Sequence, residues 1–489
     1  MERSWTIPRA SLLAAICLVA AASARGGDTI VLKNGRRIIA LSVTQDGEKI
    51  VYETISGTLS IPRSIVDHIE RGAVSSSEAA TNASTVTLKP PESEASSATL
   101  PPSAGEIESH VIQNGEVDRI YVDQLDQEAH SGQALANQNA AMAHHAASQF
   151  ELTRGEMDLA LQDARSALIY LPGQPVLLMN TAYLYLRRSE YTQSLEYIEH
   201  ARRLVPEDPE VSKLAGWAYY GLNKMDLAVA EWKHAASLRP DAEVQAALQR
   251  AQRDKQEEEQ YKENESSHFS LRYSGASEPS LARSVLHTLE RHYGAIESEL
   301  NYSPPDSIGV ILYTQQAFAD ITQVPGWVGA LNDGRIRVPV QGLNDVTPEL
   351  SRVLKHELTH SFVGQKTLGR APTWIQEGLA QWMEGKRSDL NAGALIALYQ
   401  NDPALGLKHF AGDWMKLSNA EASAAYAWAL ANVEYMVQAG GMNDVDRILD
   451  RLAAGDSAEA AVKAVIRCDY PDLTHDTVQY LRGKYGNAN

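Results

Sequence analysis

Residues 353–365 read VLKHELTHSFVGQ and place two histidines four positions apart around a glutamate. In a helix, His356 and His360 lie about one turn apart, so both imidazoles project from the same side and can reach one metal ion. Glu357 lies roughly 100° further around the helix, beside such an ion, where its carboxylate can take a proton from an attacking water. The alternative is a helix with two surface histidines, because a motif with two free positions is weak on its own. The surrounding sequence therefore has to decide between the two.

The residues around this motif predict a helix. Thr347 can cap its start, and Pro348 suits the first helical position. Gly364 is expected to end the helix, because glycine readily adopts the left-handed conformation found at helix C-termini. The apolar face of the helix consists of Leu350, Val353, Leu354 and Leu358.

A second helix is predicted within residues 371–385, APTWIQEGLAQWMEG. Thr373 and Gln376 match a capping box at its start, and Glu377 follows in the first full turn. The intervening GQKTLGRAP is long enough to reverse the chain, so two antiparallel helices would place Glu377 opposite the two histidines. Two imidazoles and one carboxylate leave a fourth tetrahedral position open for water, which is the arrangement of catalytic rather than structural zinc.

The sequence HELTH followed by WIQEGLAQ resembles the gluzincin metallopeptidases, the clan of thermolysin-like and aminopeptidase-like enzymes. The resemblance is closest to the bacterial peptidase MA-like proteins and covers about residues 266–485. It implies an α+β zincin-like metallopeptidase domain in which His356, His360 and Glu377 bind Zn²⁺ and Glu357 is the general base. The paired motifs are specific for the clan and say little about the substrate.

A hydrogen-bond donor is also needed for the negative charge that develops on the substrate carbonyl oxygen. Tyr426, in AAYAWALANVEYMVQAGG, resembles the catalytic tyrosine that begins a comparable helix in some zinc aminopeptidases. A core tyrosine is the alternative interpretation, and Tyr435 is the weaker candidate. Gln381, one turn after Glu377, is expected to orient a ligand histidine, although thermolysin-like enzymes have an aspartate at that position.

The segment from residue 266 to the zinc motif predicts strands and one helix. HFSLRYS and SIGVILYT predict strands, and PSLARSVLHTLERHYGAIESEL between them predicts an amphipathic helix. GRIRVPV, residues 334–340, predicts a strand at a sheet edge, because Pro339 cannot donate a ladder hydrogen bond. Clan members bind an extended peptide antiparallel to such a strand, so the resemblance implies a substrate-binding edge here. After residue 348 the sequence is almost entirely helical.

Residues 141–262 contain a 34-residue period that resembles the tetratricopeptide repeat. The repeated positions are Pro172, Pro206 and Pro240; Ala167, Ala201 and Ala235; Ala160, Ser194 and Ala228; and Ser148, Ala182 and Gly216. Small residues let paired helices approach closely, and each proline closes a second helix. We expect an α-solenoid of three repeats, about 141–240, with a polar, solvent-facing capping helix, which binds a protein partner or substrate. An unrelated helical bundle is the alternative.

Residues 28–72 predict a small all-β domain. Its alternating apolar residues are separated by Asn34-Gly35, Asp46-Gly47 and Ser56-Gly57, which are hairpin signals. Residues 73–140 are predicted to be a flexible linker. Its first part is rich in Ser, Ala, Thr, Glu and Pro, a composition that cannot bury enough apolar surface to offset chain entropy. Its second part is polar and also compatible with a strand followed by the start of a helix.

Residues 1–24 predict a secretory signal peptide. Two arginines precede an apolar stretch, SLLAAICLVAAASA, that ends in the small residues Ala22, Ser23 and Ala24. The stretch is too short to span a bilayer. A lipoprotein signal that uses Cys17 is the disfavoured alternative, because the preceding AAI fits such a signal poorly.

The cysteine content and the net charge limit the disulfides and the binding partners of the predicted exported protein. Only Cys468 would remain after signal cleavage, so no internal disulfide can form. An exported protein of this kind fits a periplasmic or extracellular location. The formal net charge of −18 argues against nucleic acid or an anionic membrane surface as a partner.

Together these features predict a multidomain exported zinc metallopeptidase, in which water activated by the metal and by Glu357 attacks a peptide carbonyl. The repeats would recruit a protein partner or the substrate. A function of a different class is a catalytically inactive envelope scaffold that binds partners through its repeats. Hydrolysis of a non-peptide amide is a third alternative.

Overall fold

The computed structural model describes most of the chain, and helices predominate in it. The described residues are 26–33, 37–40, 42–47, 49–54, 57–72, 104–274, 279–314, 331–332, 334–340, 343–412, 414, 417 and 419–486. The predicted signal peptide, the Asn34-Gly35 turn and the first part of the predicted linker lie outside them. Within the described part, none of the helices combines the length and the apolarity needed to cross a membrane.

A strand unit at the N-terminus confirms the predicted hairpins. Its strands are β1 (Gly26–Leu32), β2 (Arg37–Ala40), β3 (Ser42–Asp46), β4 (Lys49–Thr54), β5 (Gly57–Pro62) and β6 (Val66–Gly72). They form two antiparallel sheets with strand orders β2-β1-β6 and β3-β4-β5. Gly47 follows β3 with a φ of 57°, as expected in the Asp46-Gly47 turn of a hairpin.

Residues 104–140 are mostly helical, which corrects the second part of the predicted linker 73–140. They comprise α2 (Ala104–Val111), a short hairpin of β7 (Ile112–Gln113) and β8 (Glu116–Val117), and α3 (Arg119–Ala129). The reason is that apolar residues recur on one face of these helices. Ile107, Val111, Val122 and Leu125 are buried in one cluster with alanines of the next helix.

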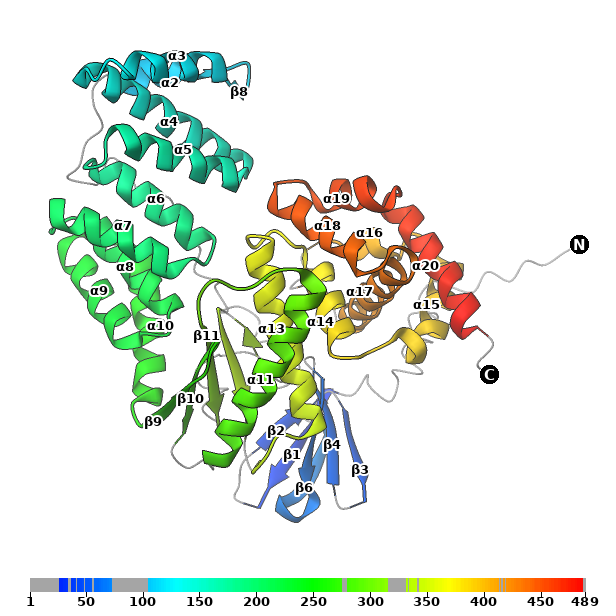
Figure 1. Ribbon diagram of the computed structural model, residues 1–489. Coiled ribbons are helices and arrows are strands. Elements are labelled where there is room, and N and C mark those ends of the chain that lie inside the picture. The colour runs from blue at the N-terminus through cyan, green and yellow to red at the C-terminus, as the bar shows by residue number, and fades with distance from the viewer. Residues whose placement is uncertain are drawn as a thin grey trace, which may run out of the picture.

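Three helix pairs follow, and Figure 1 shows them stacked in an arc beside the rest of the molecule. They are α4 (Ala134–Arg154) with α5 (Met157–Tyr170), α6 (Pro175–Arg187) with α7 (Tyr191–Leu204), and α8 (Pro209–Gly221) with α9 (Met225–Leu238). The helix α10 (Ala242–Glu258) closes the stack.

The small residues of the 34-residue period lie where paired helices meet. Ser148 donates a hydrogen bond to the carbonyl oxygen of Ala160 at 2.7 Å, and Ser194 donates one to that of Ala182 at 2.9 Å. A Cβ added to Gly216 would overlap the Trp232 indole. The period therefore marks the contact of each pair, while the tetratricopeptide assignment itself stays a prediction.

A five-stranded mixed sheet follows the helix pairs. It contains β9 (Tyr261–Glu265), β10 (Phe269–Ser274), β11 (Ile308–Tyr313), β12 (Leu331–Asn332) and β13 (Arg335–Pro339), in the order β12-β13-β11-β10-β9. The helix α11 (Pro279–Leu300) connects β10 to β11. The inner three strands are parallel, and β9 and β12 pair antiparallel at the two edges.

The predicted edge strand 334–340 lies inside the sheet, which corrects that prediction. β13 is buried and is covered on its outer side by β12, which pairs with it at Leu331 and Asn332 in the part of the chain that the structure describes. Pro339 lies beyond this short pairing, so its missing N–H breaks no hydrogen bond with β12. The edge is therefore β12.

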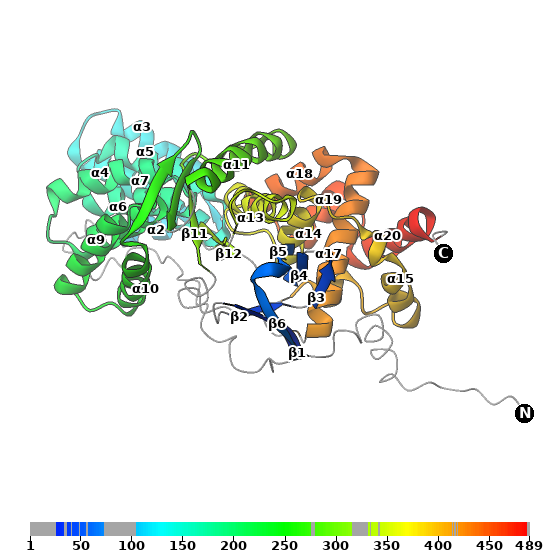
Figure 2. The same cartoon turned by 90° about the horizontal axis from the view of Figure 1, so that it is seen from below.

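The chain from residue 348 to 486 is helical, as predicted. Its helices are α13 (Pro348–Lys366), α14 (Thr373–Met383), η2 (Ser388–Leu390), α15 (Ala392–Asn401), α16 (Leu407–Phe410), α17 (Asn419–Gly440), α18 (Met442–Ala453), α19 (Ala458–Ile466) and α20 (Tyr470–Tyr485). The strand β5 packs on α13, and Figure 2 shows the N-terminal strand unit beneath that helix. Buried residues of the strand unit, including Ile30 and Tyr52, share one apolar core with α11, α13 and α14.

A buried ionic network joins α10 to the sheet. Arg335 and Arg337, on β13, both contact the carboxylate of Asp254, with Arg337 Nη2 at 2.8 Å from Asp254 Oδ2. Glu258 accepts a hydrogen bond from Tyr313 at 2.6 Å and lies 3.4 Å from Arg335. The predicted solvent-facing capping helix is therefore buried on one side, where its acidic residues balance the arginines of the sheet.

Candidate metal centre

The helix α13 carries the two histidines and begins as predicted. Thr347 accepts a hydrogen bond from the backbone N–H of Leu350 at 3.1 Å, and Pro348 is the first helical residue. The helix does not end at Gly364, as expected, but continues to Lys366. Gly369, with a φ of 73°, reverses the chain instead, and its N–H donates to the carbonyl oxygen of Gly364 at 2.7 Å.

The helix α14 carries Glu377, but its start differs from the predicted capping box. Its N-cap is Pro372, whose carbonyl oxygen accepts hydrogen bonds from the N–H groups of Ile375 and Gln376 at 3.0 and 3.1 Å. Thr373 lies inside the helix and makes no side-chain cap. The Gln376 side chain points instead to His360, with Oε1 3.4 Å from Nδ1.

The two helices bring His356, His360 and Glu377 together. Glu377 Oε2 lies 3.5 Å from His356 Nε2, and Glu377 Oε1 lies 3.6 Å from His360 Nε2. One donor atom from each residue lies within 4.8 Å of the others. Glu377 Oε2 is buried and makes no hydrogen bond with the described residues. A buried carboxylate oxygen beside two imidazoles fits a metal ligand, because a cation would satisfy all three groups.

The carboxylates and imidazoles of the cluster stabilise each other's charged forms. Burial opposes protonation of His356, but the carboxylates of Glu377 and Glu384 outweigh it and raise the pKa of His356 to about 10. Burial also opposes ionisation of Glu377, yet His360 and His356 hold its pKa below the usual range. The carboxylate is therefore ionised at neutral pH and ready to bind a cation.

Close packing of α14 against α17 fixes Glu377. A Cβ added to Gly378 would lie 2.5 Å from the carbonyl oxygen of Ala429. Gln381 Nε2 donates to the carbonyl oxygens of Glu377 and Tyr426, both at 3.1 Å. Gln381 was expected to orient a histidine, and the structure corrects this, since its side chain ties α14 to α17.

Glu384 is a second carboxylate beside His356, one of the predicted ligands, and the sequence-based prediction missed it. Its Oε1 lies 3.3 Å from His356 Nδ1, and Lys386 Nζ approaches the same oxygen to 3.0 Å. The Glu384 side chain is fully buried. The available signal was its spacing, because a residue seven positions after Glu377 returns to the same face of the helix after two turns.

We expect Glu384→Gln to weaken zinc binding by about 10–100-fold, because a neutral amide orients and polarises His356 less well than a carboxylate. Competition with a chromophoric chelator measures the dissociation constant. Asp389→Asn, an exposed carboxylate-to-amide change on η2, is the matched control. Equal affinities of the two variants would rule out the role assigned to Glu384.

Glu357 lies on α13 beside the cluster and is 3 % exposed. Its backbone carbonyl oxygen accepts a hydrogen bond from Asn332 Nδ2 at 2.8 Å, and Asn332 also donates to Ser361 Oγ at 2.6 Å. Asn332 belongs to β12, so the sheet edge is held against α13 at the residue predicted to be the general base.

Tyr426, on α17, lies near the carboxylates of the cluster. Burial raises the pKa of Tyr426 well above its usual value, and the charges of Glu377 and Glu357 raise it further. The phenol is therefore protonated and able to donate a hydrogen bond at neutral pH. Tyr435 donates instead to Asp476 on α20 at 3.4 Å. The structure thus favours Tyr426 over Tyr435 as the tyrosine of the site.

Comparison with known proteins agrees with this geometry. A model of the Peptidase MA superfamily matches residues 306–483, from two residues before β11 into α20. This match supports the predicted zincin-like metallopeptidase domain, and it leaves the strand unit and the helix pairs outside. No curated protein matches the chain.

Proposed function

We propose that this protein is an exported zinc-dependent metallopeptidase. The observation that carries the proposal is the meeting of His356, His360 and Glu377 within the segment that the Peptidase MA superfamily matches. Two imidazoles and one carboxylate suit Zn²⁺ with one position left open. When bound there, the ion supplies Lewis acidity, which polarises a peptide carbonyl and acidifies water.

Glu357 acts as the general base in this proposal. Its place on α13, one residue after His356, puts it beside the ligands and not among them. Its carboxylate accepts a proton from the attacking water and passes that proton to the leaving amine. Its burial excludes bulk solvent, which strengthens its interaction with the reacting groups.

Tyr426 donates a hydrogen bond to the carbonyl oxygen as negative charge develops there. Its raised pKa supports this role, because a phenol that stays protonated remains a donor throughout the working range. The edge strand β12 positions the substrate by antiparallel backbone pairing. Its Asn332 is already held against α13, so a paired peptide would run next to Glu357.

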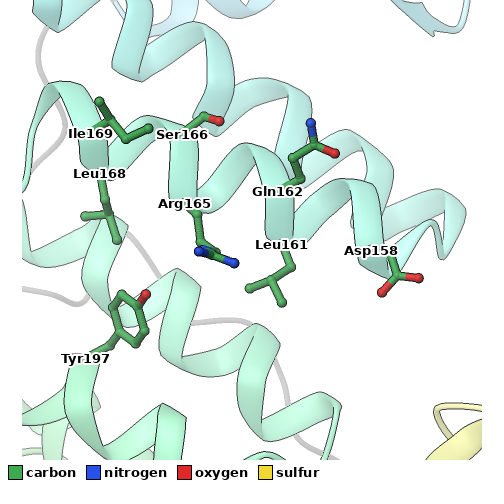
Figure 3. Close-up of a pocket in the computed structure, with 8 residues that line it drawn as sticks. All are labelled: Asp158, Leu161, Gln162, Arg165, Ser166, Leu168, Ile169 and Tyr197. Carbon is green, nitrogen blue, oxygen red and sulfur yellow. The ribbon is translucent and has the colours of Figure 1, made fainter.

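The helix pairs recruit a protein partner or the substrate. A groove of about 630 Å³ between α5 and α7 is lined by Asp158, Leu161, Gln162, Arg165, Ser166, Leu168, Ile169 and Tyr197 (Figure 3). Among these lining residues, Ile169 is 75 % exposed. Apolar side chains flanked by charged ones suit a polypeptide ligand. Export rests on residues 1–24, whose composition is that of a signal peptide.

Metal content and chelation test the proposal. Atomic absorption on the purified protein should find about one zinc per chain, and the protein should hydrolyse denatured casein. Removal of the metal by a chelator should abolish hydrolysis, and added Zn²⁺ should restore it. A zinc-free protein without activity would favour the inactive envelope scaffold, and zinc without casein hydrolysis would direct the search to other amides.

A further inference from the structure

The loop between α13 and α14 sets the distance between the histidines and Glu377. His360 lies on the helix before the loop and Glu377 on the helix after it. A shift of the loop therefore changes the geometry of the three donor atoms. Given the proposed metal site, the contacts that hold this loop therefore bear on metal binding.

Hydrogen bonds within the loop fix its two ends to each other. Thr367 is buried, and its hydroxyl donates to the carbonyl oxygen of Val363 at 2.7 Å and accepts from the N–H of Ala371 at 3.2 Å. Leu368 adopts a φ of 54°, which is uncommon for a residue with a Cβ. Such a conformation persists where surrounding contacts impose it.

Further contacts of the loop come from the helix pairs, outside the segment that the superfamily matches. The side chain of Leu368 packs against a buried apolar cluster of α5 and α6. The cluster consists of Met157, Ala160, Leu161, Ala164, Leu184 and Tyr185. Leu368 is the residue of the loop that contacts this cluster, so the loop packs against the stack.

Arg370 makes the second contact of the loop. Its guanidinium occupies the space in which a Cβ on Gly155, in the α4–α5 turn, would lie. Its Nη1 donates to the carbonyl oxygen of Ala453 at 3.2 Å, at the end of α18. Arg370 therefore connects the α4–α5 turn to the C-terminal end of α18.

Two further junctions keep the stack in place. Thr192, at the start of α7, donates from its hydroxyl to Asp306 Oδ1 at 2.6 Å. The buried network of Asp254 and Arg337 joins α10 to the sheet. Because the stack is held at these points, it can act as a fixed support for the loop.

We propose that Leu368 and Arg370 are positioning residues through which the helix pairs keep Glu377 in register with the two histidines. The stack supplies no ligand atom, yet it forms part of the metal site. A disturbance on the stack side of the contact therefore weakens metal binding.

Gly155→Ala tests this from the stack side. The added methyl group displaces the Arg370 guanidinium, and we expect zinc binding to weaken by about 2- to 30-fold. Gly132→Ala is the matched control, because Gly132 has a similarly positive φ of 70° but open space around it. Both variants carry similar backbone strain, so the difference between their zinc affinities reports the contact with Arg370. Zinc dissociation constants come from chelator competition and folding from circular dichroism.

Combination with Arg370→Ala completes the test. In that background the Gly155→Ala methyl group meets no guanidinium, so it should add no further loss of affinity. Equal zinc affinities of Gly155→Ala and Gly132→Ala would overturn the inference. Should Gly155→Ala not fold, Arg370→Ala, compared with the exposed Arg203→Ala, decides by the same measurement. Failure of the unaltered chain to bind zinc would instead refute the proposed function.

Discussion

Replacing Glu357 with glutamine is expected to lower kcat for casein hydrolysis by about 10²–10⁴-fold, because an amide cannot accept the proton of the attacking water. Zinc content should stay at the level of the unaltered protein, since Glu357 is not one of the three proposed ligands. The release of acid-soluble peptides measures hydrolysis, and atomic absorption on the same sample measures the zinc content.

The control separates this effect from a general change of charge. Glu299→Gln removes one carboxylate from an exposed position on α11 and should leave both quantities unchanged. Full activity of Glu357→Gln would refute the mechanism. Loss of zinc together with activity would instead assign Glu357 to metal binding.

Removal of the Asp254 carboxylate is expected to lower the free energy of unfolding by about 3–5 kcal/mol, because Asp254→Ala leaves Arg335 and Arg337 buried with fewer opposing charges. Burial opposes ionisation of Asp254, but Arg337 and Arg335 hold its pKa below the usual range. The contribution is therefore present at neutral pH and is lost as the pH falls through this lowered pKa.

Urea denaturation followed by circular dichroism measures the loss. Asp158→Ala is the matched control, because Asp158 pairs with Arg188 at the surface with a side chain that is 77 % exposed. An exposed pair contributes about 0–1 kcal/mol. Similar losses for the two variants would show that the network between α10 and the sheet contributes no more than a surface ion pair.

Local sequence signals predicted both helices of the site and the start of α13, but not the end of α13 or the cap of α14. Thr347 and Pro348 start α13 because a capping side chain and a fixed φ act within a few residues. Gly364 and Thr373 have the right residue types for a helix end and a cap, yet neither position is used in that way. Their roles depend on the loop held between two domains, which is a tertiary constraint.

The side-chain contacts between helices were harder to predict than the three proposed metal ligands. The positions of His356, His360 and Glu377 follow from the helical period and the reversal of the chain. The choice between Gln381 and Glu384 depends on the rotation of α14 about its axis, which is set by the contact of Gly378 with α17. Likewise, Pro339 indicated a sheet edge, whereas the two-residue strand β12 that covers β13 is too short to show a pattern.

The seating of β5 on α13 has a consequence for the order of synthesis. The strand unit ends at Gly72, and the helix that covers it begins at Pro348, roughly 280 residues later. At about 5–20 residues per second, a ribosome needs roughly 15–55 s to reach that helix. Throughout this interval α13 cannot bury the apolar side of the strands. A nascent chain that stalls before the helix therefore exposes an apolar surface that promotes aggregation. Shortened versions of this protein should therefore keep both segments or lose both.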